Sequence, residues 1–248
     1  MMDRVVANEF AKMRHLRIAP VAIVMVAAVT GLVMFSAITS PDFADPAARS
    51  WELLLGGMSL AVPMVSPIML AVLASRQVDI EHEGGGWLLS QTSGITPGGL
   101  CRVKLVAVGA VVTVATVLQS VLVIGAGLLL GVTAAVPAGL WLGHTASVLA
   151  TNLVVLALHV LLSARIDNQL AGLGIGVLGS MVAVFASGLP PWLAHVSPWG
   201  YYALVAAAGY RDGDLVALTP SYASVAGLGV VGAALFLLVT GSFDRREI

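Results

Sequence analysis

Six long apolar stretches, separated by short polar connections, dominate the chain. Each is long enough to cross roughly 30 Å of hydrocarbon as a helix, since a helix rises about 1.5 Å per residue. The strict alternation of a barrel strand is absent, and in lipid each segment must satisfy its own backbone hydrogen bonds. We therefore predict an all-α polytopic membrane protein with spans at about 18–40, 52–75, 103–131, 140–163, 169–189 and 216–241.

The composition strengthens this prediction. Of the 248 residues, 58% are hydrophobic and 10% are charged, against roughly 25% charged residues in soluble domains. Six spans use most of the length, so we expect residues 1–248 to form a single transmembrane domain. The net charge of −1 argues against a nucleic-acid partner. The single cysteine, Cys101, excludes an intramolecular disulfide.

The first apolar run is preceded by basic residues, as in a signal peptide, but it is too long for a typical signal sequence. We interpret it as a retained signal anchor. Upstream, residues 2–17 place Val6, Phe10 and Met13 at spacings of four and three, away from the basic side chains. This spacing predicts an interfacial helix. A frayed polar tail is the alternative, because short isolated helices are marginal.

The basic residues are distributed unequally between the two sets of connections. Ten fall on one side and two, Arg49 and Arg211, on the other. Because Lys and Arg stay on the cytoplasmic side, both termini are predicted to be cytoplasmic. The ten are Arg4, Lys12, Arg14, Arg17, Arg76, Arg102, Lys104, Arg165, Arg245 and Arg246.

The cytoplasmic connection 76–102 contains ordered signals. The glycines at 84–86 follow an acidic stretch and are expected to break the helix. Trp87 then begins a short segment that Gly94 can end by a C-cap. Thr96 and Pro97 restart a helix as N-cap and first helical residue.

On the opposite side, residues 190–209 are too long for a turn and too polar at their ends to span the membrane. We predict a re-entrant or interfacial element there. Trp192, Trp199, Tyr201 and Tyr202 flank it or begin its apolar part. Such aromatic rings are typical of the headgroup level, where they serve as plain belt residues in most proteins.

Few polar side chains fall inside the spans. Gln119, His144, Asn152 and His159 are candidates for a polar translocation path, with Thr151 beside Asn152. The alternative is that they form hydrogen bonds between neighbouring helices, which is common in membrane bundles. Because no acidic residue falls in the middle of a span, ion-coupled transport is disfavoured.

Two further features concern helix packing. Gly172, Gly176 and Ser180 recur every four residues and predict a close helix contact, within the chain or with a second subunit. Pro63 and Pro67 remove backbone donors and are expected to bend the second span. Such a bend can line a cavity, act as a hinge or serve packing alone.

The sequence lacks the motifs of an enzyme. It has no phosphate-binding GxxxxGK[ST] loop, no nucleophile elbow, no paired catalytic carboxylates and no metal-ligand spacing. We therefore expect neither catalysis nor a cofactor or metal bound by this chain. The energy for active transport must therefore come from outside this chain, as in a permease subunit driven by a separate ATPase.

In this context the chain resembles the permease subunits of type-2 ABC exporters, especially the small six-helix permeases of lantibiotic immunity and bacitracin-type resistance. The resemblance covers nearly the whole chain and depends on the order of its segments. They are Glu9 to Lys12, Asp79 to Gly84 with Trp87 to Leu89, Ser197 to Tyr201, and Phe243 to Ile248. The three glycines at 84–86 depart from the family pattern.

The resemblance implies that the segment after the second span docks on a soluble ABC ATPase, which would hold ATP and Mg. The residues that carry over to this contact are Glu81, Glu83, Trp87, Leu88 and Leu89. It also implies a second permease subunit, the same chain or a related one, and export of an amphipathic or peptide-like substrate such as a peptide antibiotic or drug. The alternatives are a secondary transporter or channel and, less favoured, an intramembrane enzyme.

Overall fold

The computed structural model describes residues 2–46, 48–211 and 214–245 and is built almost entirely of helices. Within these residues, six helices are long and apolar enough to cross a membrane. This confirms the predicted all-α polytopic fold class. The six are α2 (Ile18–Thr39), α4 (Trp51–Glu83), α6 (Pro97–Leu129), α7 (Ala138–Arg165), α8 (Gln169–Phe185) and α11 (Tyr222–Phe243).

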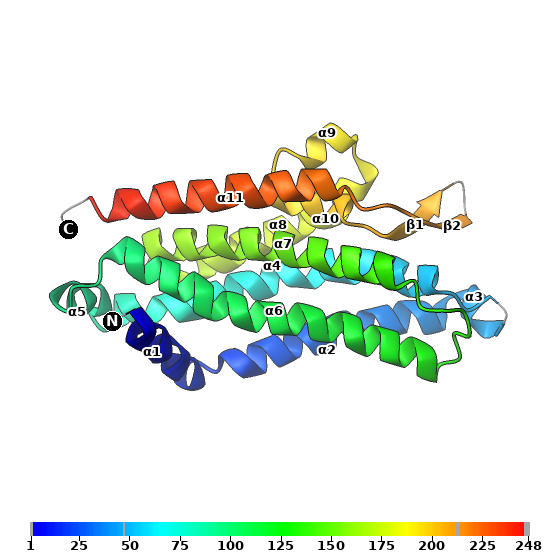
Figure 1. Cartoon of the computed structure of the whole chain (residues 1–248), viewed down its shortest axis with the longest axis horizontal. Coiled ribbons are helices and arrows are strands. Elements are labelled where there is room, and N and C mark those ends of the chain that lie inside the picture. The colour runs from blue at the N-terminus through cyan, green and yellow to red at the C-terminus, as the bar shows by residue number, and fades with distance from the viewer. Residues whose placement is uncertain (1, 47, 212–213, 246–248) are drawn as a thin grey trace.

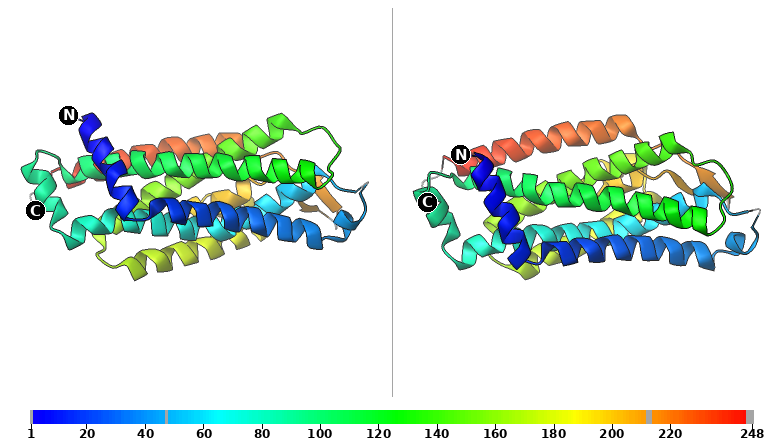
Figure 2. Two further views of the ribbon diagram at one scale, coloured as in Figure 1. Left: turned by 90° about the horizontal axis from the view of Figure 1, so that it is seen from below. Right: turned by 60° about the horizontal axis from the view of Figure 1, so that its bottom comes forward.

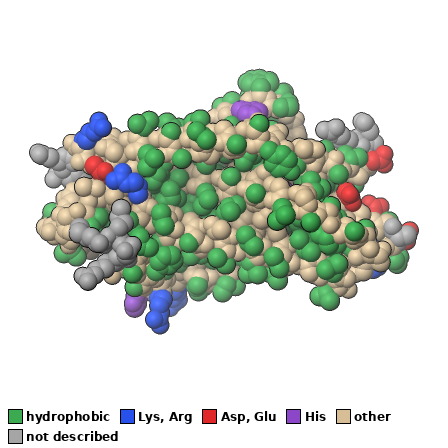
Figure 3. All heavy atoms as spheres, in the orientation of Figure 1, with side chains coloured by type: hydrophobic (Ala, Val, Ile, Leu, Met, Phe, Trp, Pro, Cys, Tyr) green, Lys and Arg blue, Asp and Glu red, His purple; other side chains and the backbone are tan. Residues whose placement is uncertain are grey.

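The long helices lie side by side in an elongated bundle with two distinct ends (Figure 1). Both labelled termini and the short helix α5 (Gly86–Thr92) lie at one end, which we call the α5 end. The short helix α3 (Pro41–Ala44) and a β-hairpin lie at the other, the hairpin end. Charged side chains gather at the two ends, while the surface between them is mostly apolar (Figure 3). This distribution matches a bundle embedded in lipid.

Helix α4 forms the centre of the bundle and α11 its periphery. In the most apolar window of α4, 61% of residues are buried, against 17% in α11. Leu70, Leu73 and Val78 of α4 are completely buried in the core, in contact with apolar side chains from several other helices. The remaining apolar surface of α11 faces outward, where lipid or another subunit can cover it.

The N-terminal helix α1 (Met2–His15) crosses the α5 end obliquely, beside α2 and α6 (Figure 2). Arg17, in a left-handed conformation with φ 54°, makes the turn into α2. The face that α1 turns toward the bundle differs from the predicted apolar stripe, because Glu9 and Met13 are buried while Phe10 is 43% exposed. The helix is therefore attached partly through a charged residue.

Two spans are longer than predicted and take up much of the segment 76–102. Helix α4 continues to Glu83, and α6 starts at Pro97. The expected signals between them are confirmed. Gly85 and Gly94 have φ values of 61° and 76°, and the Thr96 hydroxyl accepts a hydrogen bond from the Gly99 amide as N-cap.

The region before the last span folds into short elements. They are η1 (Ala186–Gly188), α9 (Pro191–Ala194), η2 (Pro198–Gly200) and α10 (Tyr201–Leu204), followed by the antiparallel strands β1 (Ala208–Arg211) and β2 (Asp214–Ala217). This hairpin was not predicted from the sequence. The predicted start of the last span, at 216, is also too early, because α11 begins at Tyr222. Pro220 explains the later start, because a proline inside a helix removes a hydrogen bond.

Candidate functional site

The α5 end presents a short exposed helix that continues directly from the central helix of the bundle. Only Gly84 and Gly85 separate the last residue of α4 from the first of α5. The left-handed conformation of Gly85 allows the chain to turn sharply there. Helix α5 protrudes beyond the ends of its neighbours (Figure 1). Its position is therefore set mainly by the last turns of α4.

Three of the five residues expected to dock on an ATPase lie on the surface of this region. Leu88 and Leu89 are 68% and 69% exposed, and Glu83 is also exposed. Two exposed leucines next to each other, beyond the ends of the long helices, form an apolar patch of the kind that marks a binding surface.

Trp87 lies between the surface and the bundle. Its indole N–H points to His82 Nδ1 at 3.4 Å, with the two rings edge to face. On the other side of the imidazole, Nε2 is 2.9 Å from the carbonyl oxygen of Ser163. Because a carbonyl can only accept, Nε2 carries the proton and Nδ1 is free to accept from Trp87. His82 thus connects α5 to the end of α7.

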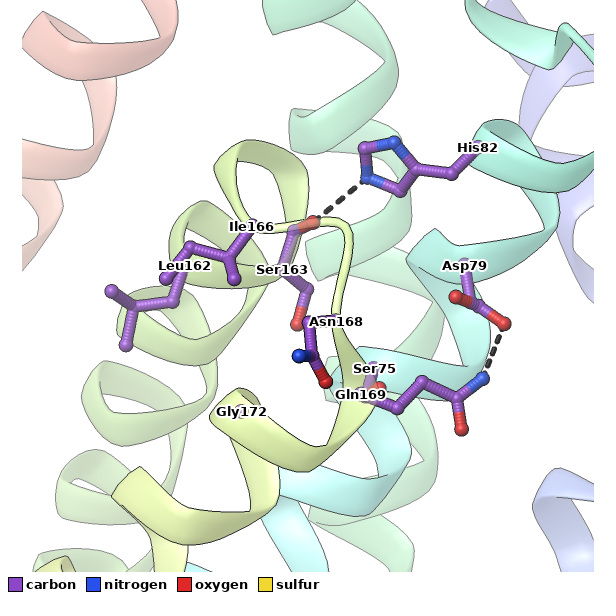
Figure 4. Close-up of a pocket in the computed structure, with 9 residues that line it drawn as sticks. All are labelled: Ser75, Asp79, His82, Leu162, Ser163, Ile166, Asn168, Gln169 and Gly172. Atoms are coloured by element: carbon purple, nitrogen blue, oxygen red, sulfur yellow. Dashed lines mark hydrogen bonds between the residues drawn. The ribbon is translucent and has the colours of Figure 1, made fainter.

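A second contact connects the end of α4 to the start of α8. Figure 4 shows the Gln169 amide pointing to the carboxylate of Asp79, next to the contact between His82 and Ser163. Asn168 accepts the Leu170 amide and caps α8 in the same small pocket. The last turns of α4 are therefore held on one side by the connection between α7 and α8.

On another side, α4 takes part in a group of four charges, three buried and one, Lys12, partly exposed, which we call the ion quartet. It consists of Glu9 and Lys12 from α1, Glu81 from α4 and Lys104 from α6. Lys12 Nζ lies 2.6 Å from Glu9 Oε1 and 2.7 Å from Glu81 Oε1. Lys104 Nζ lies 2.8 Å from Glu9 Oε2 and 2.7 Å from Glu81 Oε1. Two acids and two bases alternate, so the charges balance.

The hydrogen bonds of the quartet are nearly complete. Lys104 has three N–H donors, and they meet Glu9 at 2.8 Å, Glu81 at 2.7 Å and the backbone carbonyl of Gln77 at 2.8 Å. The Gln77 side-chain amide donates to Glu9 Oε2, also at 2.8 Å. Lys104, Glu9 and Glu81 have exposures of 0%, 1% and 3%. Burial of charge to this degree requires such pairing.

The pKa values on α1 are shifted by the quartet. Burial alone would raise the pKa of Glu9, but the charge of Lys104 and hydrogen bonds from Lys104, Lys12 and Gln77 lower it below its ordinary value. Burial would lower the pKa of Lys12, but hydrogen bonds to Glu81 and Glu9 and their charges raise it. Both residues are therefore held in their charged forms.

The quartet changes the interpretation of Glu81. As a predicted docking residue it was expected at the surface, but its carboxylate is buried between two lysines. Glu9, Lys12, Gln77 and Lys104 were not predicted as site residues from the sequence. A lysine seven residues inside the long apolar helix α6 was the available signal, because charges within spans are costly and usually paired.

The polar residues proposed for a translocation path are all buried. Tyr202 donates from its hydroxyl to Asn152 Oδ1 at 2.6 Å, and Asn152 Nδ2 donates to the Thr116 hydroxyl at 3.1 Å. This chain joins α10, α7 and α6. Among the described residues, the Thr151 hydroxyl bonds only to the Ser147 carbonyl of its own helix. In this conformation Asn152 connects helices.

The other three path candidates are placed differently. His144 Nδ1 lies 2.8 Å from the carbonyl of Val205, which fixes α10 to α7. The ring of His159 packs edge to face against Trp199 at 6.2 Å between centroids. Gln119 is completely buried, and neither its Oε1 nor its Nε2 has a hydrogen-bond partner among the described residues. No hydrogen bond joins any two of the four candidates among the described residues.

The small-residue face of α8 packs within the chain, against the proline-containing part of α4. A Cβ at Gly176 would lie 2.6 Å from the Cβ of Ala71. The Ser180 hydroxyl lies 2.8 Å from the carbonyl of Met64 and 3.2 Å from that of Pro63. Pro67, which has no N–H, leaves the Pro63 carbonyl without its helical partner. Gly172 has wider surroundings, because a Cβ at that position would lie 4.0 Å from the Ser163 hydroxyl.

A comparison with family models identifies the class of protein that this architecture represents. The model described as "ABC-2 family transporter protein" matches residues 5–183, well over half of the chain. The chain therefore belongs to this family and is a membrane permease subunit of an ABC transporter. A search of the curated proteins found no match.

The matched residues include α1 from residue 5 onward, α5 and the whole ion quartet, and they end inside α8. Members of this family form the membrane component of a transporter whose ATPase is an ABC protein. The short elements before α11, and α11 itself, lie outside the match.

Proposed function

We propose that this chain is the membrane-spanning subunit of an ATP-driven exporter, with α5 as the element that docks on a separate ABC ATPase. The observation that carries the proposal is the exposed apolar surface of α5. Leu88 and Leu89 lie exposed in the middle of α5, which continues from the central helix of the bundle. An apolar surface beyond the spans, next to the exposed Glu83, suits a groove on a soluble partner.

In this proposal ATP and Mg bind only to the partner, and two permease subunits, identical or related, form the membrane part. The α5 end is cytoplasmic, as the ten-to-two distribution of basic residues supports. Arg246 of that count lies outside the described residues. The location is a bacterial plasma membrane.

The substrate class is proposed from the resemblance to the lantibiotic-immunity and bacitracin-resistance permeases. It is an amphipathic or peptide-like compound that leaves the cell. Asn152, His144, His159 and Gln119 are neutral polar groups that would line a path only in another conformation of the bundle, because all four are buried in this one.

Co-purification tests the docking proposal. The tagged chain is extracted from its own membranes in mild detergent, and bound ATPase is quantified. We expect the double substitution Leu88→Asp/Leu89→Asp to remove the ATPase while the chain still inserts. Thr92→Asp adds charge to the same helix without removing apolar surface, and it should retain the ATPase. Equal binding by all three chains would refute docking through α5.

A further inference from the structure

The first residue of α5 lies directly on a member of the ion quartet. A Cβ at Gly86 would be in severe overlap with Glu81 Oε2 and 2.9 Å from the Glu81 Cα. No side chain fits there unless the carboxylate or α5 moves. Gly84, two residues earlier, is different, because the closest neighbour of a Cβ there is the Ile80 carbonyl at 3.6 Å, an ordinary contact. Helix α5 and the Glu81 carboxylate are thus in close steric contact.

From the same carboxylate, contacts lead to two other helices. Oε1 of Glu81 accepts both Lys12 of α1 and Lys104 of α6, each at 2.7 Å. Glu9 closes the group by accepting the same two ammonium groups. N–H···O hydrogen bonds in proteins have donor–acceptor distances of about 2.7–3.2 Å. A shift of the carboxylate by about one ångström would therefore break or redirect contacts to both helices.

The chemistry of the quartet suggests a role beyond stability. A buried ion pair contributes little net stability compared with apolar residues of the same size, because desolvation offsets the attraction. Hydrogen-bonded ion pairs of this kind are nevertheless directional, and they have two discrete arrangements, paired and separated. Packed elements with such discrete arrangements can carry a displacement from one site to another.

We propose that the ion quartet is the positioning element through which a movement of α5 reaches α1 and α6. The proposal depends on the proposed function, in which the ATPase moves α5. Glu81 and Lys104 are positioning residues, because both side chains are buried inside the bundle and act on neighbouring helices. In this proposal a movement of the Gly86 backbone displaces the Glu81 carboxylate. The displaced carboxylate then shifts its two partners, Lys104 in α6 and Lys12 in α1.

The first test uses the chain alone in lipid vesicles and a displacement built into α5. Gly86→Ala places a methyl group against the Glu81 carboxylate, and Gly84→Ala is the matched control in the same link. Amide hydrogen exchange is followed by mass spectrometry. We expect Gly86→Ala to raise the exchange rate of α1 amides by about tenfold or more. The intact quartet makes local opening of α1 costly, and the added methyl group removes part of that cost by displacing the Glu81 carboxylate. Gly84→Ala should leave α1 unchanged.

Two results would contradict the proposal that the quartet transmits a movement of α5 to α1. One is unchanged exchange in α1 of the Gly86→Ala chain, whatever happens in α5. The other is an equal increase in α8, which contributes no residue to the quartet and would indicate general loosening.

The second test uses the complex with the co-purified ATPase. The paired substitution Glu81→Gln/Lys104→Met removes one charge of each sign at similar volume, so the chain is expected to fold. The control Arg102→Met/Asp244→Asn removes a partly exposed pair, 2.9 Å apart, at the same end of the bundle. We expect the first variant to bind the ATPase normally but to lose most of the substrate-dependent ATP turnover, tested with bacitracin as probe, about tenfold. The control should keep both.

Normal bacitracin-dependent ATP turnover in the Glu81→Gln/Lys104→Met complex would contradict the proposed transmission through the quartet. If the wild-type chain captures no ATPase, the proposed function fails instead, and the exchange experiment on the chain alone still decides whether displacement of α5 reaches α1.

Discussion

The buried polar groups at the α5 end and those deeper in the bundle differ in their charge and in the completeness of their hydrogen bonds. The ion quartet contains three buried charges and the partly exposed Lys12, and each of its members has two oppositely charged partners within 2.8 Å. The deeper groups are neutral and only partly satisfied. Asn152 has two partners, whereas the Gln119 amide has none among the described residues.

This difference indicates what each region can tolerate. A charge without a partner is far more costly in a low-dielectric interior than an amide without one. The quartet therefore has to stay balanced, while the neutral groups can exchange partners at smaller cost. A region of the second kind is better suited to a changing path, and one of the first kind to a defined mechanical contact.

The largest effect is expected from breaking the balance of the quartet. Lys104→Met leaves two buried carboxylates with one lysine and should lower the free energy of unfolding by about 3–5 kcal/mol. Unfolding in mixed detergent micelles measures this change. The paired variant Glu81→Gln/Lys104→Met should recover most of the loss, and equal losses in both chains would contradict the importance of charge balance.

A smaller loss is expected from pH. The pKa of Glu9 is lowered, so its stabilising contribution is complete above the ordinary value of 4.5 and is lost as pH falls through the lowered value. The pKa of Lys12 is raised, so its contribution is complete below the ordinary value of 10.5 and is lost as pH rises through the raised value. Stability should thus have a plateau between these two values, measured by unfolding across pH.

A second carboxylate, Asp244, also contributes to the stability that is lost as pH falls, and this carboxylate can be removed by substitution. Burial would raise the pKa of Asp244, but hydrogen bonds from Thr96, Arg102 and the Gly98 amide, with the charge of Arg102, lower it. Asp244→Asn removes this carboxylate, and the remaining acid loss should come mainly from Glu9. If the acid limb disappeared completely in this variant, the Glu9 contribution would be refuted.

Among the neutral groups, Asn152→Leu should have a moderate effect. It leaves the buried hydroxyls of Tyr202 and Thr116 without the amide that joins them. We expect a loss of about 1–2 kcal/mol, the usual range for such bonds between membrane helices. Thr151→Val, one residue earlier and bonded only within its own helix, serves as the control. Equal losses would show that the interhelical chain contributes nothing specific.

The smallest effect is expected at Gln119. Gln119→Leu replaces an amide that has no partner among the described residues by an apolar group of similar size. Stability should stay the same or rise by about 1 kcal/mol, because an unsatisfied buried polar group is removed. A loss of more than that would show that the amide finds partners which this conformation does not contain. Unfolding under the same conditions provides the measurement.

Several local features could be predicted from sequence because their causes lie within a few residues. The apolar runs indicated the six spans. The three glycines at 84–86 indicated the break after α4, and Thr96 with Pro97 indicated the start of α6. The hairpin before α11 had a signal in the sequence as well, since the dipeptide Asp212-Gly213 is typical of hairpin turns. Those two residues lie outside the described part of the chain.

The candidate site could be predicted only in part, for a reason that the quartet makes clear. The sequence by itself determined that α5 is short, is flanked by glycines and contains Leu88 and Leu89. Only the tertiary structure decided that Glu81 turns inward to Lys12 and Lys104, 69 and 23 residues away. Hydrophobic pattern and turn chemistry act locally, whereas the pairing of buried charges depends on which helices pack together.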